Sequence, residues 1–271
     1  MRKITGTLAI ALGLALATQA AFADDTLESI KKKGVIVIGV KNDYKPWGFL
    51  TPAGEIVGLE IDMSDEIAKK IGVKLEKIPV TAANRLEFLQ QGKIDMLIAT
   101  MSDKPERRRV VQAIEPLYYA DYVNVLLNKK AGINDWNDLK GKAVCATSGA
   151  WYNKDVARLY GPEIVSFDGS EKPLYAMKQG NCIGYLYDQT FLQGKILDDE
   201  WKTDYALPLK GILEAPWMMA VALGNSSLQK MLEDTTKDWM KTGFIVDEEK
   251  KWGVTPTEYS QSMHEKYKGM N

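Results

Sequence analysis

The chain has 271 residues, of which 45% are hydrophobic and 26% are charged, a composition typical of globular proteins with one large core or two smaller ones. Its formal net charge of −1 provides no basic field, so we expect no nucleic acid among its partners. The single histidine, His264, argues against a histidine triad or a histidine-rich metal site. We also find no serine elbow, metal-ligand spacing or phosphate loop, and we expect no cofactor.

The N-terminal residues are typical of an export signal. Arg2 and Lys3 precede a mostly apolar run over residues 4–17, which is too short to span a bilayer comfortably. The sequence Ala21-Phe22-Ala23 is a small-x-small cleavage site. We therefore expect residues 1–23 to be a cleaved signal peptide, and the alternative is an uncleaved anchor helix.

Strands and helices are predicted to alternate from residue 34 onward. The predicted strands cover residues 35–40, 73–80 and 96–99. One helix ends at Gly72, a second over 85–91 has Asn84 as its cap, and a third begins near Lys104 after a capping-box pattern that starts at Asp103. This order predicts an open α/β sheet with mainly parallel strands.

A second α/β series follows an extended stretch over residues 118–127. Its predicted strands cover 142–146, 164–167 and 182–187, and its predicted helices cover 136–139, 152–160 and 173–179. A long amphipathic helix over 228–240 is expected to rejoin the first series. We therefore predict lobe 1 from residues 24–128 and 214–271, lobe 2 from 129–213, and two chain crossings that form a hinge.

The two cysteines are predicted to lie on strands of the same lobe. An exported protein enters an oxidising compartment, so a disulfide between Cys145 and Cys182 is permitted. The alternative is two small buried side chains. The sequence does not give the Cα separation that a bridge requires, and both interpretations stay open.

Short motifs occur in a specific order along the chain: GLEIDM (58–63), QGKID (91–95), TMS followed by PER (100–107), PLYY (116–119), LKGK (139–142), YD (187–188) and WG (252–253). Together they resemble the periplasmic amino-acid-binding proteins of ABC transporters, bacterial solute-binding family three. The resemblance implies a two-lobed periplasmic-binding-protein architecture of type II, with a mainly parallel open sheet in each lobe and a two-crossing hinge. It also implies a periplasmic monomer that passes a small amino acid to an inner-membrane ABC permease.

A free amino acid carries a carboxylate and an ammonium, so enclosing it requires a fixed cation and a fixed anion. Arg107 matches the family's arginine after Pro-Glu, which binds the ligand carboxylate through paired hydrogen bonds. The alternative is a solvated charge within the basic run 107–109. Asp188 is predicted at the carboxyl end of a buried strand, where open α/β sheets bind ligands, and it matches the family's ammonium-binding aspartate. Its alternative role is a helix cap.

Further contacts are implied by the resemblance. Thr100 and Ser102 match hydroxyl-bearing ligand contacts, and the alternative is ordinary loop chemistry. Thr147 and Gly149 precede a helix whose free N–H groups can receive a carboxylate. The family usually has threonine or serine after this glycine, whereas this chain has Ala150 and Trp151. Trp151 is expected either to wall the pocket or to lie in the core.

The selectivity for a ligand side chain is predicted from four positions. Lys41 and Arg85 match cations of members that resemble acidic-amino-acid binders, which suggests glutamate or aspartate. Tyr44 and Trp47 match aromatics that stack on cationic or neutral ligands. We predict a polar or acidic amino acid.

Two other functions are considered. A cyclohexadienyl dehydratase resembles the same family, and such an enzyme needs a proton donor in the cleft. The candidate donor is Glu214, whose alternative role is a hinge or surface carboxylate. A chemoreceptor partner that presents a ligand is the third hypothesis. We predict a binding protein and no enzyme activity.

Overall fold

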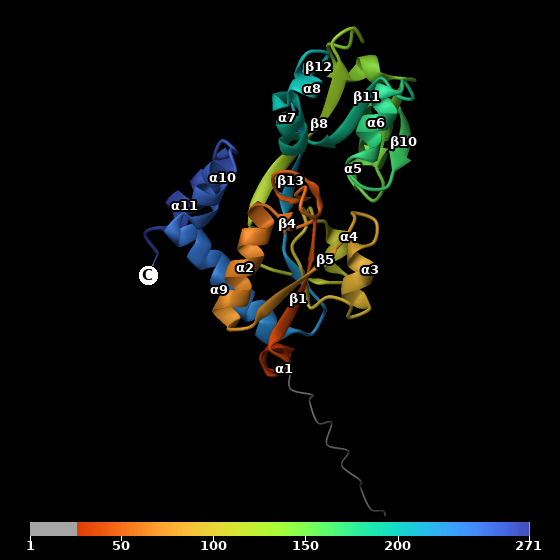
Figure 1. Cartoon of the computed structure of the whole chain (residues 1–271). Coiled ribbons are helices and arrows are strands. Elements are labelled where there is room, and N and C mark those ends of the chain that lie inside the picture. The colour runs from red at the N-terminus through yellow and green to blue at the C-terminus, as the bar shows by residue number, and fades with distance from the viewer. Residues whose placement is uncertain (1–25, 271) are drawn as a thin grey trace, which may run out of the picture.

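The computed structural model describes residues 26–270, so the predicted signal peptide lies outside the described residues. Two α/β lobes, each with its own sheet, lie one above the other and confirm the predicted fold class (Figure 1). Within residues 26–270 we find no helix with the length and hydropathy needed to cross a membrane.

Lobe 1 contains a five-stranded sheet in the order β5 (Lys74–Pro79), β1 (Val35–Val40), β6 (Met96–Leu97), β14 (Ala220–Val221) and β7 (Gln112–Ala113). Strand β1 pairs in parallel with β5 and β6, whereas β14 is antiparallel to its neighbours. Strand β1, which lies between β5 and β6, is a continuous apolar run, as expected for a strand covered on both faces. The main helices of this lobe are α1 (Thr26–Lys33), α2 (Leu59–Ile71), α3 (Arg85–Gln90) and α9 (Ser226–Thr242).

The predicted helix that ends at Gly72 is α2. Gly72 has a left-handed backbone with φ of 83°, and its N–H donates to the carbonyl oxygens of Ala68 and Lys69. Glycine adopts this conformation without steric cost, which explains why the helix ends there. The buried face of α2 includes Ile61, Ile67 and Ile71.

Two predicted helix caps are wrong. The Asn84 side chain does not cap α3, because its Oδ1 accepts a hydrogen bond from the N–H of Thr81 instead. Asp103 does not cap α4 (Pro105–Arg108), because its carboxylate binds the exposed Arg108 guanidinium. The donor lies before the helix in the first case and at its last residue in the second, and in both cases it binds the side chain that residue type alone assigns to the cap.

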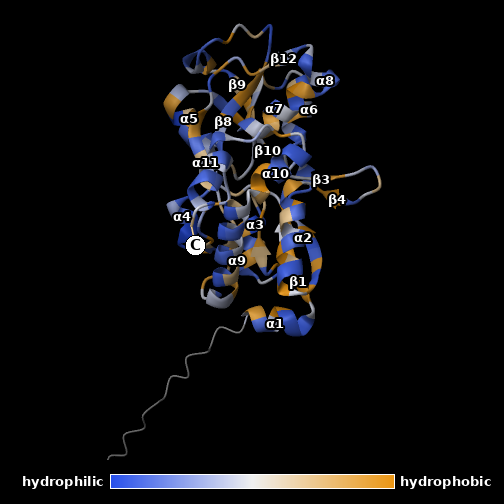
Figure 2. Ribbon diagram, turned by 90° about the vertical axis from the view of Figure 1, so that its left-hand side faces the viewer, coloured by the Kyte–Doolittle hydropathy of each residue, from blue (hydrophilic) through white to orange (hydrophobic). Residues whose placement is uncertain are grey.

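A small sheet of β2 (Asp43–Tyr44), β3 (Gly48–Leu50) and β4 (Ile56–Val57) was not predicted. Figure 2 shows the hairpin of β3 and β4 standing off the side of lobe 1. Strands this short carry too little periodicity to be recognised in a sequence. The sheet follows β1 directly and therefore positions residues 43 and 44 at the interface between the lobes.

Lobe 2 contains a six-stranded sheet in which β10 (Glu163–Phe167), β9 (Ala143–Thr147), β11 (Gly184–Asp188), β8 (Tyr119–Asn128) and β12 (Tyr205–Ala206) lie in this order. The first three strands are parallel, and β8 is antiparallel to β11. The other elements of the segment are η1 (Trp136–Leu139), α5 (Tyr152–Tyr160), α6 (Lys172–Lys178), α7 (Gln189–Leu197) and α8 (Asp199–Lys202). The helix predictions over 136–139 and 152–160 match the observed bounds.

Two antiparallel strands, β8 and β13 (Ile212–Trp217), run side by side at the junction of the lobes (Figure 1). Aromatic side chains pack against this pair: the ring centroid of Trp47 lies 4.4 Å from that of Tyr119 and 4.8 Å from that of Trp217. The C-terminal helices α10 (Phe244–Lys251) and α11 (Glu258–Tyr267) join the same region, because the Tyr119 hydroxyl donates to the buried Glu249 at 3.0 Å.

The two cysteines form a disulfide. Their Cα atoms are 5.5 Å apart, within the range that a bridge requires. Cys145 lies on β9, and Cys182 precedes the neighbouring strand β11. Of the two interpretations that the sequence left open, the structure favours the bridge.

Candidate functional site

A narrow cavity lies where the two lobes meet. Its volume is about 10 Å³, room for about one water molecule, so a larger occupant requires the lining side chains or the lobes to move. We call the part formed by Lys41, Ala82, Arg85, Thr100, Ser102 and Arg107 the lobe 1 wall. The lobe 2 wall is formed by Ala150, Trp151, Tyr152, Tyr187 and Asp188.

Arg107 places a buried positive charge in the lobe 1 wall. Its side chain is 7% exposed, its Nη1 donates to the carbonyl of Ser102 at 2.8 Å, and its Nη2 donates to the carbonyl of Gly149 in lobe 2 at 3.4 Å. Burial lowers the pKa of Arg107 to about 9, and the nearby charge of Arg85 acts in the same direction. No carboxylate among residues 26–270 forms an ion pair with it. A buried cation without a counter-ion is a favourable site for an anion.

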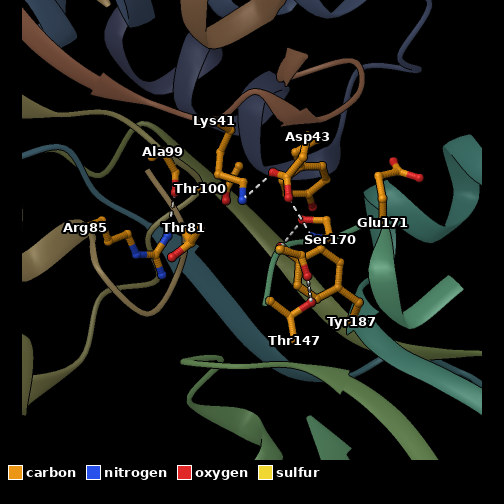
Figure 3. A network of polar contacts seen from close by, with 12 residues as sticks. Lys41, Asp43, Thr81, Arg85, Ala99, Thr100, Thr147, Ser170, Glu171 and Tyr187 are labelled. Carbon is orange, nitrogen blue, oxygen red and sulfur yellow. Dashed lines mark hydrogen bonds and ion pairs between the residues drawn. The ribbon is translucent and has the colours of Figure 1, made fainter. Parts of the chain in front are cut away.

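Arg85, at the start of α3, adds a second buried cation. Its Nη1 donates to the carbonyl of Ala99 at 2.5 Å (Figure 3), whereas its Nε is buried without a hydrogen-bond partner in the described structure. Burial lowers the pKa of this guanidinium. One donor of Arg85 is therefore still available inside the cavity region.

Lys41 lines the cavity as predicted, but its charge is already paired. Its Nζ lies 2.6 Å from Oδ1 of Asp43, and Oδ2 of Asp43 accepts a hydrogen bond of 2.6 Å from the N–H of Ser170 in lobe 2 (Figure 3). Lys41 thus belongs to a polar chain that joins the lobes. This pairing weakens the expectation that Lys41 faces a ligand side chain.

Asp188 places a buried negative charge in the lobe 2 wall, at the carboxyl end of β11. Its Oδ1 accepts from the Tyr152 hydroxyl at 3.0 Å and its Oδ2 from the Tyr44 hydroxyl at 3.2 Å. The carboxylate makes no cap hydrogen bond to α7, so it does not take the alternative role of a helix cap. Burial raises the pKa of Asp188 to about 6, although the hydrogen bond from Tyr152 and the charge of Arg85 each lower this pKa.

Glu60, which the sequence indicated only as part of the motif over residues 58–63, holds the loop that carries Thr100 and Ser102. Thr100 has a φ of 48°, an unusual backbone for threonine that is often found at functional sites. Its N–H donates to Oε1 of Glu60 at 2.8 Å, and this carboxylate also accepts from the Tyr118 hydroxyl. Burial raises the pKa of Glu60 to about 7. The available sequence signal is an acidic residue between two apolar residues, Leu59 and Ile61, in the first turn of α2.

Three predicted residues of lobe 2 lie at or beside the cavity. Thr147 is behind the wall, because its hydroxyl is bonded to the hydroxyl of Tyr185 and the carbonyl of Gly169. Gly149 has a φ of 81°, and a Cβ atom there would lie 2.7 Å from backbone atoms of Ala82 in lobe 1. Trp151 lines the cavity at the start of α5, and the first N–H groups of this helix have no acceptor within the helix.

Two of the three predicted aromatic ligand contacts, Tyr44 and Trp47, are not brought to the cavity. Trp47 is fully buried in the aromatic cluster beside the crossing strands, where tertiary packing determines its place. Tyr44 stands behind Asp188 and orients its carboxylate. Besides Trp151, the aromatic residues that line the cavity are Tyr152 and Tyr187. In the sequence, these two tyrosines are marked only by being adjacent to the predicted contacts Trp151 and Asp188.

The candidate proton donor of the enzyme hypothesis lies elsewhere. Glu214 is exposed on β13 and does not line the cavity. The only carboxylate in the two walls is Asp188, which its two tyrosine hydrogen bonds hold. Within residues 26–270 no cluster of side chains suited to a metal ion is present.

Comparison with known proteins identifies related chains. The model of the bacterial extracellular solute-binding proteins, family 3, matches residues 36–255. The ABC transporter glutamine-binding protein of Bacillus subtilis is 32% identical over 235 residues, which cover 84% of each chain. The glutamate/aspartate import solute-binding protein of Salmonella typhimurium is 26% identical over 269 residues, covering 93% of this chain and 87% of that protein.

Among solved structures, an ancestral amino acid-binding protein described as a precursor of cyclohexadienyl dehydratase has a TM-score of 0.74 at 24% identity. The match covers 84% of this chain and 98% of that chain. This likeness shows a shared fold.

Proposed function

Because the chain belongs to the bacterial extracellular solute-binding proteins of family 3, we propose that it captures an amino acid for an ABC importer. The observation that carries the proposal is the pair of oppositely charged walls. Arg107 and Asp188 are buried in different lobes and neither has an ion-pair partner among the described residues. A zwitterion between them supplies the missing charge to each.

In the proposed complex the α-carboxylate binds Arg107 and the N-terminal N–H groups of α5. The geometry of a guanidinium suits two parallel hydrogen bonds to a carboxylate. The α-ammonium binds the Asp188 carboxylate and the Thr100 hydroxyl. Because these groups belong to both lobes, the ligand stabilises the closed arrangement more than the open one.

The ligand side chain is proposed to be acidic or polar. Of the three cations in the lobe 1 wall, Lys41 is paired with Asp43, whereas Arg85 and Arg107 have no ion pair within residues 26–270. After Arg107 has taken the α-carboxylate, Arg85 is available for a second carboxylate or an amide oxygen. Related proteins named for glutamine and for glutamate/aspartate support this class of ligand.

The proposal extends to location and organisation. We propose that residues 1–23 direct export to the periplasm, where the mature chain acts as a monomer and docks on an inner-membrane permease. Lobe 1 would comprise residues 24–128 and 214–271, and lobe 2 residues 129–213. The relatives are binding proteins, and the exposed position of Glu214 supports a binding role without catalysis.

The test is thermal unfolding of refolded mature protein against the common amino acids, since refolding removes copurified ligand. A ligand at about 100 times its dissociation constant adds about 2.7 kcal/mol to the free energy of unfolding. We expect the largest shift with an acidic or polar amino acid. A shift only with apolar amino acids would overturn the ligand class. No shift with any of them, together with turnover of arogenate, would favour the dehydratase.

A further inference from the structure

The mouth of the cavity can be located from the solvent exposure of the residues that line it. Eight of its eleven lining residues are buried, and only Ala82, Ala150 and Trp151 are partly exposed. Ala82 belongs to the lobe 1 wall, and the other two belong to the lobe 2 wall. The path between cavity and solvent therefore runs between residue 82 on one side and residues 150 and 151 on the other.

Two direct contacts between the lobes are made at this mouth. The Nζ of Lys104 lies 3.1 Å from the centroid of the Trp151 ring, so the ammonium faces the ring as in a cation–π interaction. Beside it, the backbone of Gly149 packs against that of Ala82 and Ala83, with no room for a Cβ atom. Lys104 has no ion pair with any described residue.

The position of Lys104 links this contact to the site. Lys104 directly precedes α4, the helix that carries Arg107, while Trp151 directly precedes α5. Each partner is thus fixed to an element that we assign to ligand binding. Since the partners come from different lobes, their contact requires the lobes to meet.

We propose that Lys104 and Trp151 form a latch across the mouth of the cavity, and that this latch slows the escape of bound ligand. The inference rests on the proposed function. A contact made in the closed arrangement and absent from the open one shifts the equilibrium toward closure. Bound ligand leaves only after the lobes part, so loss of the latch accelerates dissociation.

The test is stopped-flow dissociation of L-glutamate, or of the amino acid that gives the largest thermal shift. Lys104→Met retains much of the side-chain volume and removes the charge. We expect its dissociation rate to rise about 2- to 30-fold, the range that corresponds to a cation–π contact. Lys104→Arg keeps a cation over the ring and should restore slow dissociation. If Lys104 acted only through the packing of its aliphatic stem, the Lys104→Arg and Lys104→Met variants would release the ligand at similar rates.

A double-mutant cycle assigns the effect to the pair. If Trp151→Leu is already present, adding Lys104→Met should leave the dissociation rate unchanged. An equal acceleration by Lys104→Met in both backgrounds would contradict the latch, as would an unchanged rate in the single variant.

A second measurement separates failure of the latch from failure of the proposed function. Small-angle scattering of the unliganded protein reports the separation of the lobes without any ligand. Lys104→Met and Gly149→Ala should both increase the radius of gyration while circular dichroism stays native, with the larger increase for Gly149→Ala. If no amino acid binds, the proposed function fails, and an unchanged radius in both variants would overturn the latch by itself.

Discussion

The two walls of the cavity differ in charge. The lobe 1 wall contributes Lys41, Arg85 and Arg107, whereas the lobe 2 wall contributes Asp188 with the hydroxyls of Tyr152 and Tyr187. If Arg107 and Asp188 lay in one lobe, they could pair with each other and binding would not require closure. Because they are divided between the lobes, a molecule with both charges satisfies both walls at once. In this account, ligand binding and closure of the lobes are a single event.

The largest expected effect comes from removing the carboxylate partner in the lobe 1 wall. Arg107→Met should weaken amino-acid binding by about 2–5 kcal/mol, because the ligand carboxylate is then buried without a partner. Isothermal titration calorimetry measures the loss. Arg109→Met is the matched control, since Arg109 is exposed two residues away, and its affinity should stay that of the unmodified protein. Equal affinities of the Arg107 and Arg109 variants would remove Arg107 from the site.

The second prediction concerns the remaining cation of the lobe 1 wall. Arg85→Met should reduce affinity for L-glutamate more than for L-glutamine, by about 1.5 kcal/mol, because an ion pair with a carboxylate is lost in the first case and a hydrogen bond to a neutral amide oxygen in the second. Competition between the two amino acids measures the difference directly. An equal loss for both would assign Arg85 to holding the Ala99 carbonyl instead of selecting the ligand.

The third prediction concerns Asp188 of the lobe 2 wall and the dependence of affinity on pH. The pKa of Asp188 is raised to about 6, with Tyr44, Tyr152 and Arg85 around its carboxylate and the Asp121 carboxylate nearby. Below this pKa the group is mainly protonated and no longer attracts an ammonium. Affinity should therefore be about tenfold weaker at about pH 5 than at about pH 8, and Asp188→Asn should flatten this dependence.

The fourth prediction concerns the stability of the unliganded protein, which should increase as the pH falls, whereas the affinity decreases. Burial raises the pKa of Glu60 and of Asp121 to about 7, so in the native state these acids bind protons at higher pH than in the unfolded state. The free energy of unfolding consequently rises as the pH falls from about 8 toward about 5. Thermal melts without ligand measure it, and a parallel fall in stability and affinity would contradict this assignment.

The smallest expected effect on affinity comes from changing Glu60, which supports the lobe 1 wall. Glu60→Gln removes a charge but keeps an oxygen that can accept from the Thr100 N–H, so affinity should fall by about 1 kcal/mol. Glu60→Ala should cost more, since the Thr100 loop then loses its acceptor altogether. Calorimetry of both variants provides the comparison, and an unchanged affinity in the alanine variant would show that Glu60 does not position Thr100.

The sequence predicted those features that depend on local pattern. The apolar run of β1 and the left-handed glycine after α2 fixed a strand and a helix end. Placing Arg107 and Asp188 in different lobes depended on the order of motifs, and the structure brings both to one cavity.

Features that depend on distant partners could not be predicted. Trp47 packs with Trp217, about two thirds of the chain away, and is buried where the motif suggested a ligand contact. The role of Glu60 depends on the Thr100 backbone, 40 residues away. Asp43, which pairs with Lys41, is held by the Ser170 N–H of lobe 2, 127 residues away. Residue type predicts what a side chain can bind, whereas packing in the folded chain determines which of the possible partners it contacts.

The central claim is that one ligand binds to both walls through its two charges. Calorimetry should compare L-glutamate with 2-oxoglutarate, which lacks the ammonium, and with 4-aminobutyrate, which lacks the α-carboxylate. If another amino acid binds most tightly, its matching analogues replace these. We predict that each analogue binds at least about tenfold more weakly, the loss expected for one hydrogen-bonded charge. Binding of either analogue as tightly as the amino acid would contradict the two-wall account.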